Sequence, residues 1–328
     1  MQRLCFTCGD INGIGPEITL KTFNKIYNPP KRQIVFFCPS NVFEKTAAYI
    51  KPEYDFQILK NFRQALQNSG KILIVDLGKA ESAQGQPSVK AGKIAFKSIK
   101  AGFEVAKNHA SSAVVTAPIS KTSFKLAGIE YPGQTEIFAD LSNSKNYMMV
   151  FLSSKIICGL VTIHEPIRKV SKLIGIKRVE NKLKILERFL RIDLKIKNPK
   201  IAVLGLNPHA GENGLIGNEE TEILEPSIKF FSNKNISGPF VPDAFFATKK
   251  YKHFDAVLGM YHDQLLIPFK MMNFNKGVNY TAGLSVVRTS PDHGTAFDIA
   301  GRGIADPASM IEAVAWAEKI CWNRTKNV

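Results

Sequence analysis

An apolar run breaks abruptly into polar and glycine-rich residues in the stretch Ile201-Ala-Val-Leu-Gly-Leu-Asn-Pro-His-Ala-Gly-Glu-Asn-Gly-Leu-Ile-Gly217. This change of pattern predicts a buried strand that carries a polar loop at its carboxyl end. His209 would lie in that loop, at the edge where open α/β sheets place their ligands. Because a single loop histidine is more often a solvated or capping residue, the rest of the chain has to decide its role.

Two further apolar runs end in a histidine in the same way. One leads into Thr162-Ile-His-Glu-Pro166, and the other is Ala256-Val-Leu-Gly-Met-Tyr-His-Asp-Gln264. His164, His209 and His262 therefore share one placement. If their strands lie in neighbouring sheets, or in two subunits, the three imidazoles can converge on a divalent cation with positions left open for substrate. The alternative is three unrelated histidines with ordinary hydrogen bonds.

Apolar strands alternate with helical patterns along most of the chain. Strands are predicted at 4–8, 34–38, 72–76, 113–117, 147–152 and 156–161, and helices at 91–107 and around Val179, Leu183, Leu186 and Leu190. This alternation with short connections predicts an α/β protein whose parallel sheets are covered by helices on both faces. A chain of 328 residues, 45% of them hydrophobic, usually divides its core, so we expect two domains.

Glycines gather at the first predicted strand-to-helix turn, in Gly9-Asp-Ile-Asn-Gly-Ile-Gly-Pro-Glu17. Such a turn, with proline near the helix start, can bind an anion or bring backbones close together. The spacing is not G-x-G-x-x-G, so it does not support a dinucleotide fingerprint. A structural turn and a ligand loop both stay open.

The composition narrows the class of protein. The net charge is +16, from 44 Lys+Arg against 28 Asp+Glu, which suits anionic partners. The charges form no long block, so solvated lysine-rich helix faces are favoured over nucleic-acid binding. Five scattered cysteines indicate no disulfide framework and fit a reducing compartment. We find no signal peptide and no apolar segment of about 20 residues, and we expect a cytoplasmic protein with no membrane contact.

Several polar residues have the chemistry of substrate contacts. Lys270, Asn279 and Arg288 are spaced across 267–290, on what we expect to be short strand-like pieces, and suit a phosphate or a carboxylate. Thr135, in Tyr131-Pro-Gly-Gln-Thr-Glu-Ile-Phe138, is either the N-cap of a helix or a group that binds a substrate oxygen. Asp243 ends a loop and has no obvious structural duty.

Four motifs occur together and in order: Gly9-Asp-x-x-Gly-Ile-Gly-Pro-Glu17, Asn207-Pro-His-Ala-Gly-Glu212, Met260-Tyr-His-Asp-Gln264 and Arg288-Thr-Ser-Pro-Asp-His-Gly-Thr-Ala296. With them the chain resembles, over essentially its whole length, the 4-hydroxythreonine-4-phosphate dehydrogenase family of vitamin B6 biosynthesis. The segment from His293 to Gly303 also looks like the adenine-side loop of the wider isopropylmalate and isocitrate dehydrogenase superfamily.

The resemblance implies a fold and a set of site residues. The fold would be two α/β/α domains, as in isopropylmalate dehydrogenase, with the active site in the cleft between them and completed across a homodimer interface. The domains are expected at 1–128 with 268–328, and at 129–267. The implied residues are the metal ligands His164, His209 and His262, the substrate contacts Gln134, Thr135, Lys270, Asn279 and Arg288, and the cofactor contacts Asp292, His293, Gly294 and Thr295.

The resemblance also implies a reaction. NAD or NADP would oxidise the secondary alcohol of 4-phosphooxy-L-threonine, and the β-keto acid would lose carbon dioxide, with help from zinc, magnesium or cobalt. Asp243 and Asp263 are the candidates for accepting the alcohol proton.

This chain departs from the family at two positions. The family usually has histidine where this chain has Gln134, and glycine where it has Leu265. Gln134 leaves open a related dehydrogenase of threonate or erythronate 4-phosphate. More remote alternatives are a metal-dependent phosphohydrolase and a nucleic-acid-binding protein.

Overall fold

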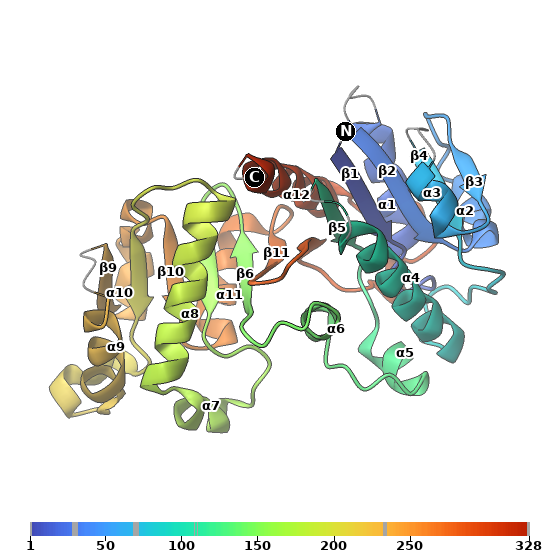
Figure 1. Ribbon diagram of the computed structural model, residues 1–328. Coiled ribbons are helices and arrows are strands. Elements are labelled where there is room, and N and C mark those ends of the chain that lie inside the picture. The colour runs from blue at the N-terminus through green and yellow to red at the C-terminus, as the bar shows by residue number, and fades with distance from the viewer. Residues whose placement is uncertain are drawn as a thin grey trace. The chain divides into compact units, whose positions relative to one another are not determined.

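The computed structural model describes residues 2–27, 32–67, 72–107, 109, 111–231 and 235–326. The chain forms two compact units (Figure 1). Unit 1 is Met1–Lys145 with Leu284–Val328, and unit 2 is Asn146–Gly283. The domain boundaries expected from the sequence, after 128 and after 267, come earlier in the chain than these divisions.

Unit 1 contains a parallel sheet whose strands follow the order β3-β4-β2-β1-β5-β12. Its elements are β1 (Gln2–Thr7), α1 (Gly15–Ile26), β2 (Arg32–Cys38), α2 (Ser40–Ala47), β3 (Gln57–Leu59), α3 (Phe62–Gln67), β4 (Ile72–Asp76), α4 (Val89–Lys107), β5 (Ser112–Thr116), α5 (Lys121–Leu126), α6 (Gln134–Leu141), β12 (Val287–Pro291), a 3-10 turn at Phe297–Ile299 and α12 (Ala308–Thr325). The parallel pairing predicted for this half of the chain is confirmed.

Helices cover both faces of the unit 1 sheet. Phe6 of β1 packs edge-on against Phe23 of α1, with ring centroids 4.8 Å apart. The next residue, Thr7, lies close to Gly102 of α4. Because successive side chains of a strand point to opposite faces, α1 and α4 lie on opposite sides of the sheet. The two faces are therefore both buried, as the continuous apolar strands predicted.

Unit 2 contains a mixed sheet with the strand order β11-β6-β7-β10-β8-β9. Its elements are β6 (Met148–Leu152), β7 (Ile157–Leu160), α7 (Ile167–Leu173), α8 (Ile176–Arg188), a π-helical turn at Phe189–Asp193, β8 (Ile201–Leu204), η2 (Pro208–Gly214), η3 (Glu220–Leu224), α9 (Glu225–Lys229), β9 (Ile236–Phe240), α10 (Pro242–Ala247), η4 (Lys250–His253), β10 (Ala256–Gly259), α11 (His262–Asn273) and β11 (Val278–Ala282). The expectation of parallel sheets is wrong for β6, which is antiparallel to both β7 and β11. A short connection, residues 153–156, joins β6 to β7, as antiparallel neighbours allow, whereas β11 comes from a distant part of the chain.

Helices also cover both faces of the unit 2 sheet. Gly159 of β7 lies against Leu186 of α8. The neighbouring residue Cys158 belongs to a core cluster that includes Leu265 and Phe269 of α11. The parallel strands β7, β10 and β8 are in register, with Leu258 opposite both Gly159 and Val203. Their carboxyl ends therefore share one edge of the sheet.

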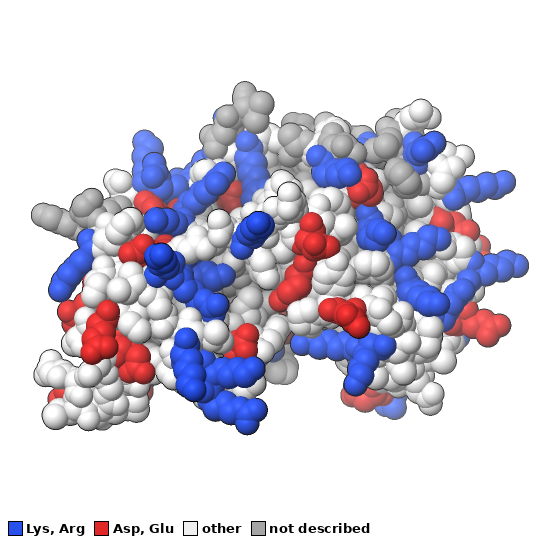
Figure 2. Space-filling model, turned by 60° about the horizontal axis from the view of Figure 1, so that its bottom comes forward, with Lys and Arg blue, Asp and Glu red and all other residues white. Residues whose placement is uncertain are grey.

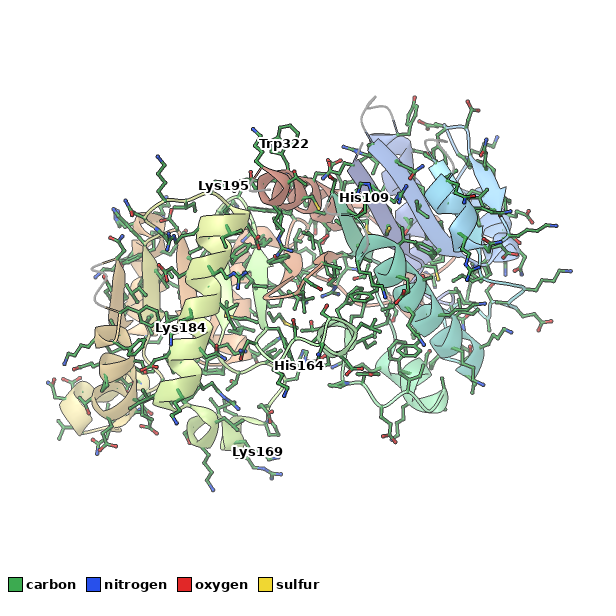
Figure 3. All side chains as sticks on the ribbon, viewed as in Figure 1. His109, His164, Lys169, Lys184, Lys195 and Trp322 are labelled. Carbon is green, nitrogen blue, oxygen red and sulfur yellow. The ribbon has the colours of Figure 1, made fainter. Side chains whose placement is uncertain are left out.

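Charged side chains are spread over the surface. Figure 2 shows Lys and Arg over much of the visible face, with Asp and Glu between them. Lys169 of α7 and Lys184 of α8, labelled in Figure 3, are exposed, and the Lys184 ammonium lies 4.5 Å from the centre of the Phe230 ring. Within the described ranges, no helix combines the length and the apolar character needed to cross a membrane.

Candidate functional site

Two of the three predicted metal ligands lie side by side at the shared strand edge of unit 2. His164 follows β7 in the loop before α7 (Figure 3), and His262 is the first residue of α11, shortly after β10. Their ring centroids are 5.7 Å apart. The strand register brings these imidazoles together, as the repeated placement predicted.

A carboxylate orients one of these imidazoles. Asp263 Oδ1 is 2.7 Å from His262 Nδ1, and the His262 side chain is 38% exposed. A histidine that donates from Nδ1 to a carboxylate presents Nε2 with its lone pair outward, which is the usual arrangement of a metal-ligating histidine. Asp263 was predicted to accept a proton from the substrate. The structure places it against His262, a contact that supports orienting the imidazole, and its role as a proton acceptor stays a prediction.

His209 lies in an unusual turn at the end of β8. It has φ +52°, and the five residues that follow, from Ala210 to Gly214, also have positive φ, so the run is six residues long. Only glycine adopts this conformation without steric cost, so surrounding contacts have to hold the turn. His209 itself is exposed.

Glu220 supplies those contacts. Its side chain is 2% exposed, and its Oε1 accepts hydrogen bonds from the backbone N–H groups of Leu206 (2.7 Å) and Asn207 (2.8 Å). Its Oε2 accepts from Asn207 Nδ2 at 2.8 Å. A buried carboxylate is tolerated when its oxygens are filled in this way. Glu220 therefore fixes the segment that leads into His209.

Gly211→Ala is expected to lower the free energy of unfolding by about 2–4 kcal/mol, since a left-handed alanine costs roughly 1–2 kcal/mol and its Cβ adds a clash. That Cβ would lie 2.6 Å from the Gly217 carbonyl oxygen and 2.7 Å from Glu220 Oε2. Urea unfolding followed by circular dichroism measures the change. Gly175→Ala, at a position with open space around it, is the control and should cost under about 1 kcal/mol. Equal effects of the two substitutions would contradict this account of the turn.

One glutamine joins the ends of β8 and β10. Gln264 Nε2 donates to the Gly205 carbonyl at 2.6 Å, and Gln264 Oε1 accepts from the Met260 N–H at 2.7 Å. Thr162 Oγ1 donates to the Met260 carbonyl at 2.7 Å, which ties in the end of β7. These bonds hold together the three strand ends that precede the histidines.

Leu265, one of the two departures from the family pattern, is a core residue. It is fully buried, and a Cβ on Gly259 would lie 2.5 Å from Leu265 Cγ. The leucine therefore fills the space that glycine leaves at the end of β10. This departure changes packing beneath the site and not a group that faces ligand.

The described residues of one chain contain no group of three or more His, Cys, Asp and Glu side chains placed to hold a metal ion. Two imidazoles come together, and the ligand role of His209 stays a prediction. Asp243, predicted in a loop, lies exposed in the first turn of α10, which packs against η2. Its role as a proton acceptor also stays a prediction.

Unit 1 holds a buried cation. Arg288 of β12 is 2% exposed, and its Nε and Nη2 donate to Thr116 Oγ1 at 3.2 and 2.9 Å. Its guanidinium carbon lies 5.8 Å from the centre of the Phe138 ring. Burial lowers the pKa of Arg288 to about 10, and the nearby Glu136 carboxylate acts in the opposite direction. The group keeps its positive charge at neutral pH, so it is suited to an anion.

The start of α6 lies at the same end of β5 as Arg288. Gln134 Nε2 donates to the Ala117 carbonyl at 3.1 Å, just past β5. Gln134 Oε1 and Glu136 Oε2 are buried and have no hydrogen-bond partner among the described residues. A buried polar atom without a partner costs about 1–3 kcal/mol, so these oxygens are suited to accept from a ligand. The N-cap prediction for Thr135 is wrong, because Gly133 is the N-cap and Thr135, 2% exposed, is inside the helix.

The remaining predicted contacts lie on different kinds of element. Lys270 is exposed on α11, so the expectation of strand-like pieces from 267 onward is wrong up to Asn273. Asn279 lies on β11, and its Oδ1 is buried with no hydrogen-bond partner in the described part of the chain. The buried residues of α11 include Leu265, Leu266 and Phe269. Their spacing of one, three and four residues is typical of a helix, and the strand-like interpretation overlooked it.

The four predicted cofactor contacts lie in the segment between β12 and α12. The Asp292 N–H donates to Ser309 Oγ at 3.1 Å, and His293 Nδ1 is 3.1 Å from the Gly294 carbonyl. The Thr295 carbonyl accepts from the Ile14 N–H at 3.0 Å, while Gly294 is exposed with open space around it. Backbone contacts thus hold this segment and leave its central glycine accessible.

Comparison with known proteins decides the family. Residues 30–317 match the model of the pyridoxal phosphate biosynthetic protein PdxA. The chain belongs to this family. A PdxA relative, the 4-hydroxythreonine-4-phosphate dehydrogenase of Bacteroides thetaiotaomicron, is 38% identical over 333 residues, which cover 99% of this chain and 90% of the relative. The predicted resemblance is confirmed.

Two further PdxA comparisons bear on fold and substrate. A crystal structure of 4-hydroxythreonine-4-phosphate dehydrogenase from Klebsiella pneumoniae matches with a TM-score of 0.84 and 34% identity, over 98% of both chains. It confirms the α/β fold class. The D-threonate 4-phosphate dehydrogenase of Salmonella typhimurium is also 38% identical, over 97% of this chain and 99% of the relative. PdxA relatives of similar identity thus carry two substrate names.

Four residues of this PdxA chain were missed from the sequence alone. Thr116, Glu136, Glu220 and Gln264 contact or position the predicted site residues, but the sequence analysis gave none of them a role. Glu136 and Gln264 each lie within two residues of a predicted contact, which was the available signal. Thr116 carried none, because its partner Arg288 lies 172 residues away in the chain.

Proposed function

We propose that the chain oxidises 4-phosphooxy-L-threonine with NAD or NADP and releases carbon dioxide, giving 3-amino-2-oxopropyl phosphate for pyridoxine 5′-phosphate biosynthesis. The hydroxyl-bearing carbon gives a hydride to the nicotinamide and its hydroxyl gives a proton to a base. The β-keto acid then loses its carboxylate as carbon dioxide, the electron pair of the broken C–C bond forms an enolate, and that carbon takes up a proton to give the ketone. The observation that carries the proposal is family membership over nearly the whole chain, with relatives named for this reaction. It favours a dehydrogenase over a phosphohydrolase or a nucleic-acid-binding protein.

The residues on each unit suit a phosphorylated amino acid. In unit 1, Arg288 provides a buried cation for phosphate or carboxylate, and Gln134 Oε1 provides a hydrogen-bond acceptor. In unit 2, Lys270 provides a second cation and Asn279 Oδ1 a second acceptor. Each unit therefore provides a cation that suits an anionic group and an amide oxygen that suits a hydrogen-bond donor.

A divalent cation, zinc, magnesium or cobalt, belongs to the same proposal. The paired imidazoles of His164 and His262, with Asp263 orienting one of them, fit the ligand chemistry of such an ion. When bound, the ion supplies a Lewis acid that lowers the pKa of the substrate hydroxyl and stabilises negative charge on its oxygen. His209 is the proposed third ligand.

We propose that a homodimer completes this site, with one of the three imidazoles supplied by the neighbouring subunit. The chain by itself pairs two imidazoles, and α11, which begins at His262, carries exposed apolar residues along one face. Ile267, Met271 and Phe274 are 60%, 83% and 88% exposed, at spacings of four and three residues. Such a stripe suits burial against a second copy.

We also propose a cytoplasmic location. The five cysteines are all buried and none forms a disulfide bond among the described residues, which agrees with a reducing compartment.

The second candidate is oxidation of D-threonate 4-phosphate, which has a hydroxyl where the amino acid has an ammonium group. The specific observation behind it is Gln134, together with relatives that carry this name. Gln134 Oε1 can accept from either group, so geometry alone does not separate the two.

Purified protein is expected to form NADH from 4-phosphooxy-L-threonine with kcat/KM at least about tenfold above that for D-threonate 4-phosphate, because an ammonium donor forms the stronger, charge-assisted bond. A chelator should remove the activity and added zinc, magnesium or cobalt should restore it. Erythronate 4-phosphate serves as a third substrate. A preference for either sugar acid would favour the second candidate, and activity that is insensitive to chelator would contradict the metal proposal.

A further inference from the structure

Two residues of α1, Glu17 and Lys21, form an ion pair that hydrogen-bonds to the backbone of Gly303 and Ala305. These two residues lie in the segment that follows the predicted cofactor contacts. Glu17 is 1% exposed and forms an ion pair of 3.0 Å with Lys21, one helical turn later. Glu17 Oε1 accepts from the Ala305 N–H at 2.8 Å, and Oε2 accepts from the Gly303 N–H at 3.3 Å. Lys21 Nζ donates to the carbonyls of the same two residues, at 2.9 Å for Gly303 and 2.7 Å for Ala305.

This arrangement satisfies an ion pair whose carboxylate is buried and whose ammonium group is partly buried. An ion pair taken out of water is costly unless further hydrogen bonds fill its oxygens and protons. Here Gly303 and Ala305 each provide a backbone N–H that donates to Glu17 and a carbonyl that accepts from Lys21. The pair and the segment therefore depend on each other, although 282 residues separate Lys21 from Gly303.

The glycine-rich turn before α1 contacts an earlier part of the connection between β12 and α12, at Thr295. The Ile14 N–H donates to the Thr295 carbonyl at 3.0 Å, and a Cβ on Gly13 would lie 2.7 Å from that oxygen. Gly9 and Gly15 approach the backbone carbonyls of Pro118 and Cys8 in the same way. The turn's glycines thus allow close backbone contacts, and of the two interpretations left open by the sequence, the structure supports the structural one.

We propose that Glu17 and Lys21 are positioning residues that hold the segment from Asp292 to Ala305 in the shape that receives the nicotinamide cofactor. This inference rests on the proposed function, in which Asp292–Thr295 contact the cofactor. The segment includes left-handed Ala296, Gly301 and Gly303, so it stays in one shape only while its surroundings determine it. A segment that is ordered beforehand binds more tightly, because the ligand does not have to supply the ordering free energy.

The test compares Lys21→Met and the double variant Glu17→Gln with Lys21→Met against the wild-type protein. We expect the Kd for NAD or NADP to rise about tenfold, with the KM for 4-phosphooxy-L-threonine within about twofold, since only the cofactor segment loses its anchor. Amide hydrogen exchange of peptides that span 300–306 should become faster. Lys107→Met, which breaks the exposed pair of Lys107 with Glu104 on α4, is the matched control and should change none of these.

The double variant protects the test against a folding failure, because it removes both charges and leaves no buried ion without compensation. Unchanged cofactor Kd in folded variants, with or without faster exchange, would overturn the proposal and leave the pair as a purely structural contact. If the wild-type protein binds neither NAD nor NADP, the proposed function fails as well. A cofactor Kd that is higher in the Lys21 and Glu17 variants than in the wild-type and Lys107→Met proteins supports the positioning role. This result does not depend on which phosphorylated acid is the substrate.

Discussion

Replacing His209 with alanine is expected to lower kcat/KM for NADH formation by about 10³-fold or more, because a metal ion contributes several kcal/mol to stabilising charge on the reacting oxygen. The protein should also lose bound metal, which elemental analysis after gel filtration measures directly. The fold should be retained, since His209 is exposed and the turn that carries it is held by Glu220 through Leu206 and Asn207.

The control for this substitution is His253→Ala, because His253 is an exposed histidine of the same unit, in η4, that no part of the proposal uses. It should leave activity and metal content within about twofold of the wild type, as surface substitutions usually do. Near-normal turnover of the His209→Ala protein, with its metal retained, would show that His209 is an ordinary loop histidine. A solvated or capping histidine is the alternative that the sequence alone left open for His209.

The shared strand edge was predictable because it depends on local patterns. Each apolar run ends in a polar turn, and parallel strands in register bring such turns together without further information. His164 and His262 are adjacent for this reason. The left-handed run from His209 to Gly214 was not predictable, because four of its six residues are not glycine, and residues other than glycine seldom take positive φ. Only knowledge of Glu220 beside it explains why the conformation holds.

Contacts between residues far apart in the chain were also not predictable from the sequence. Arg288 was predicted as an anion contact, but its burial against Thr116 depends on β12 pairing with β5. The grip of Glu17 and Lys21 on residues 303–305 likewise follows from the tertiary fold. A buried charged residue looks the same in sequence as an exposed one, because composition does not record what surrounds it.

The exact start of a helix was also not predictable from the sequence. Thr135 is a good N-cap residue, yet the helix begins one residue earlier and leaves it in the first turn. Capping preferences are worth about 1 kcal/mol, which tertiary contacts easily outweigh. Here Gln134, the first residue of α6, donates a hydrogen bond from its side chain to the Ala117 carbonyl, which is a tertiary contact of this kind. Gln134 and Thr135 are both buried in the first turn of α6. Burial is therefore compatible with the substrate contacts predicted for them.

Arg288→Met is expected to lower kcat/KM for 4-phosphooxy-L-threonine by about 10³-fold while the Kd for NAD changes by less than about threefold. The loss comes from removing a desolvated cation that suits a phosphate or carboxylate, a contact worth roughly 2–5 kcal/mol. Arg288→Lys should recover only part of the loss, because an ammonium group cannot offer the planar, two-point donor geometry of a guanidinium. Arg63→Met, at an exposed position of the same unit, is the matched control.

The same substitution makes an opposite prediction for stability, and this separates function from folding. Arg288 is 2% exposed, and burial lowers its pKa to about 10, so keeping it charged in the folded protein costs free energy. Methionine has a similar length and no charge, and Thr116 Oγ1 still donates to the Thr289 carbonyl at 3.3 Å. The melting temperature of Arg288→Met should therefore equal or exceed that of the wild type. A variant that loses activity and melts several degrees lower would mean that Arg288 serves the core; lost activity with unchanged or higher stability means that the fold retains a costly buried cation for the substrate.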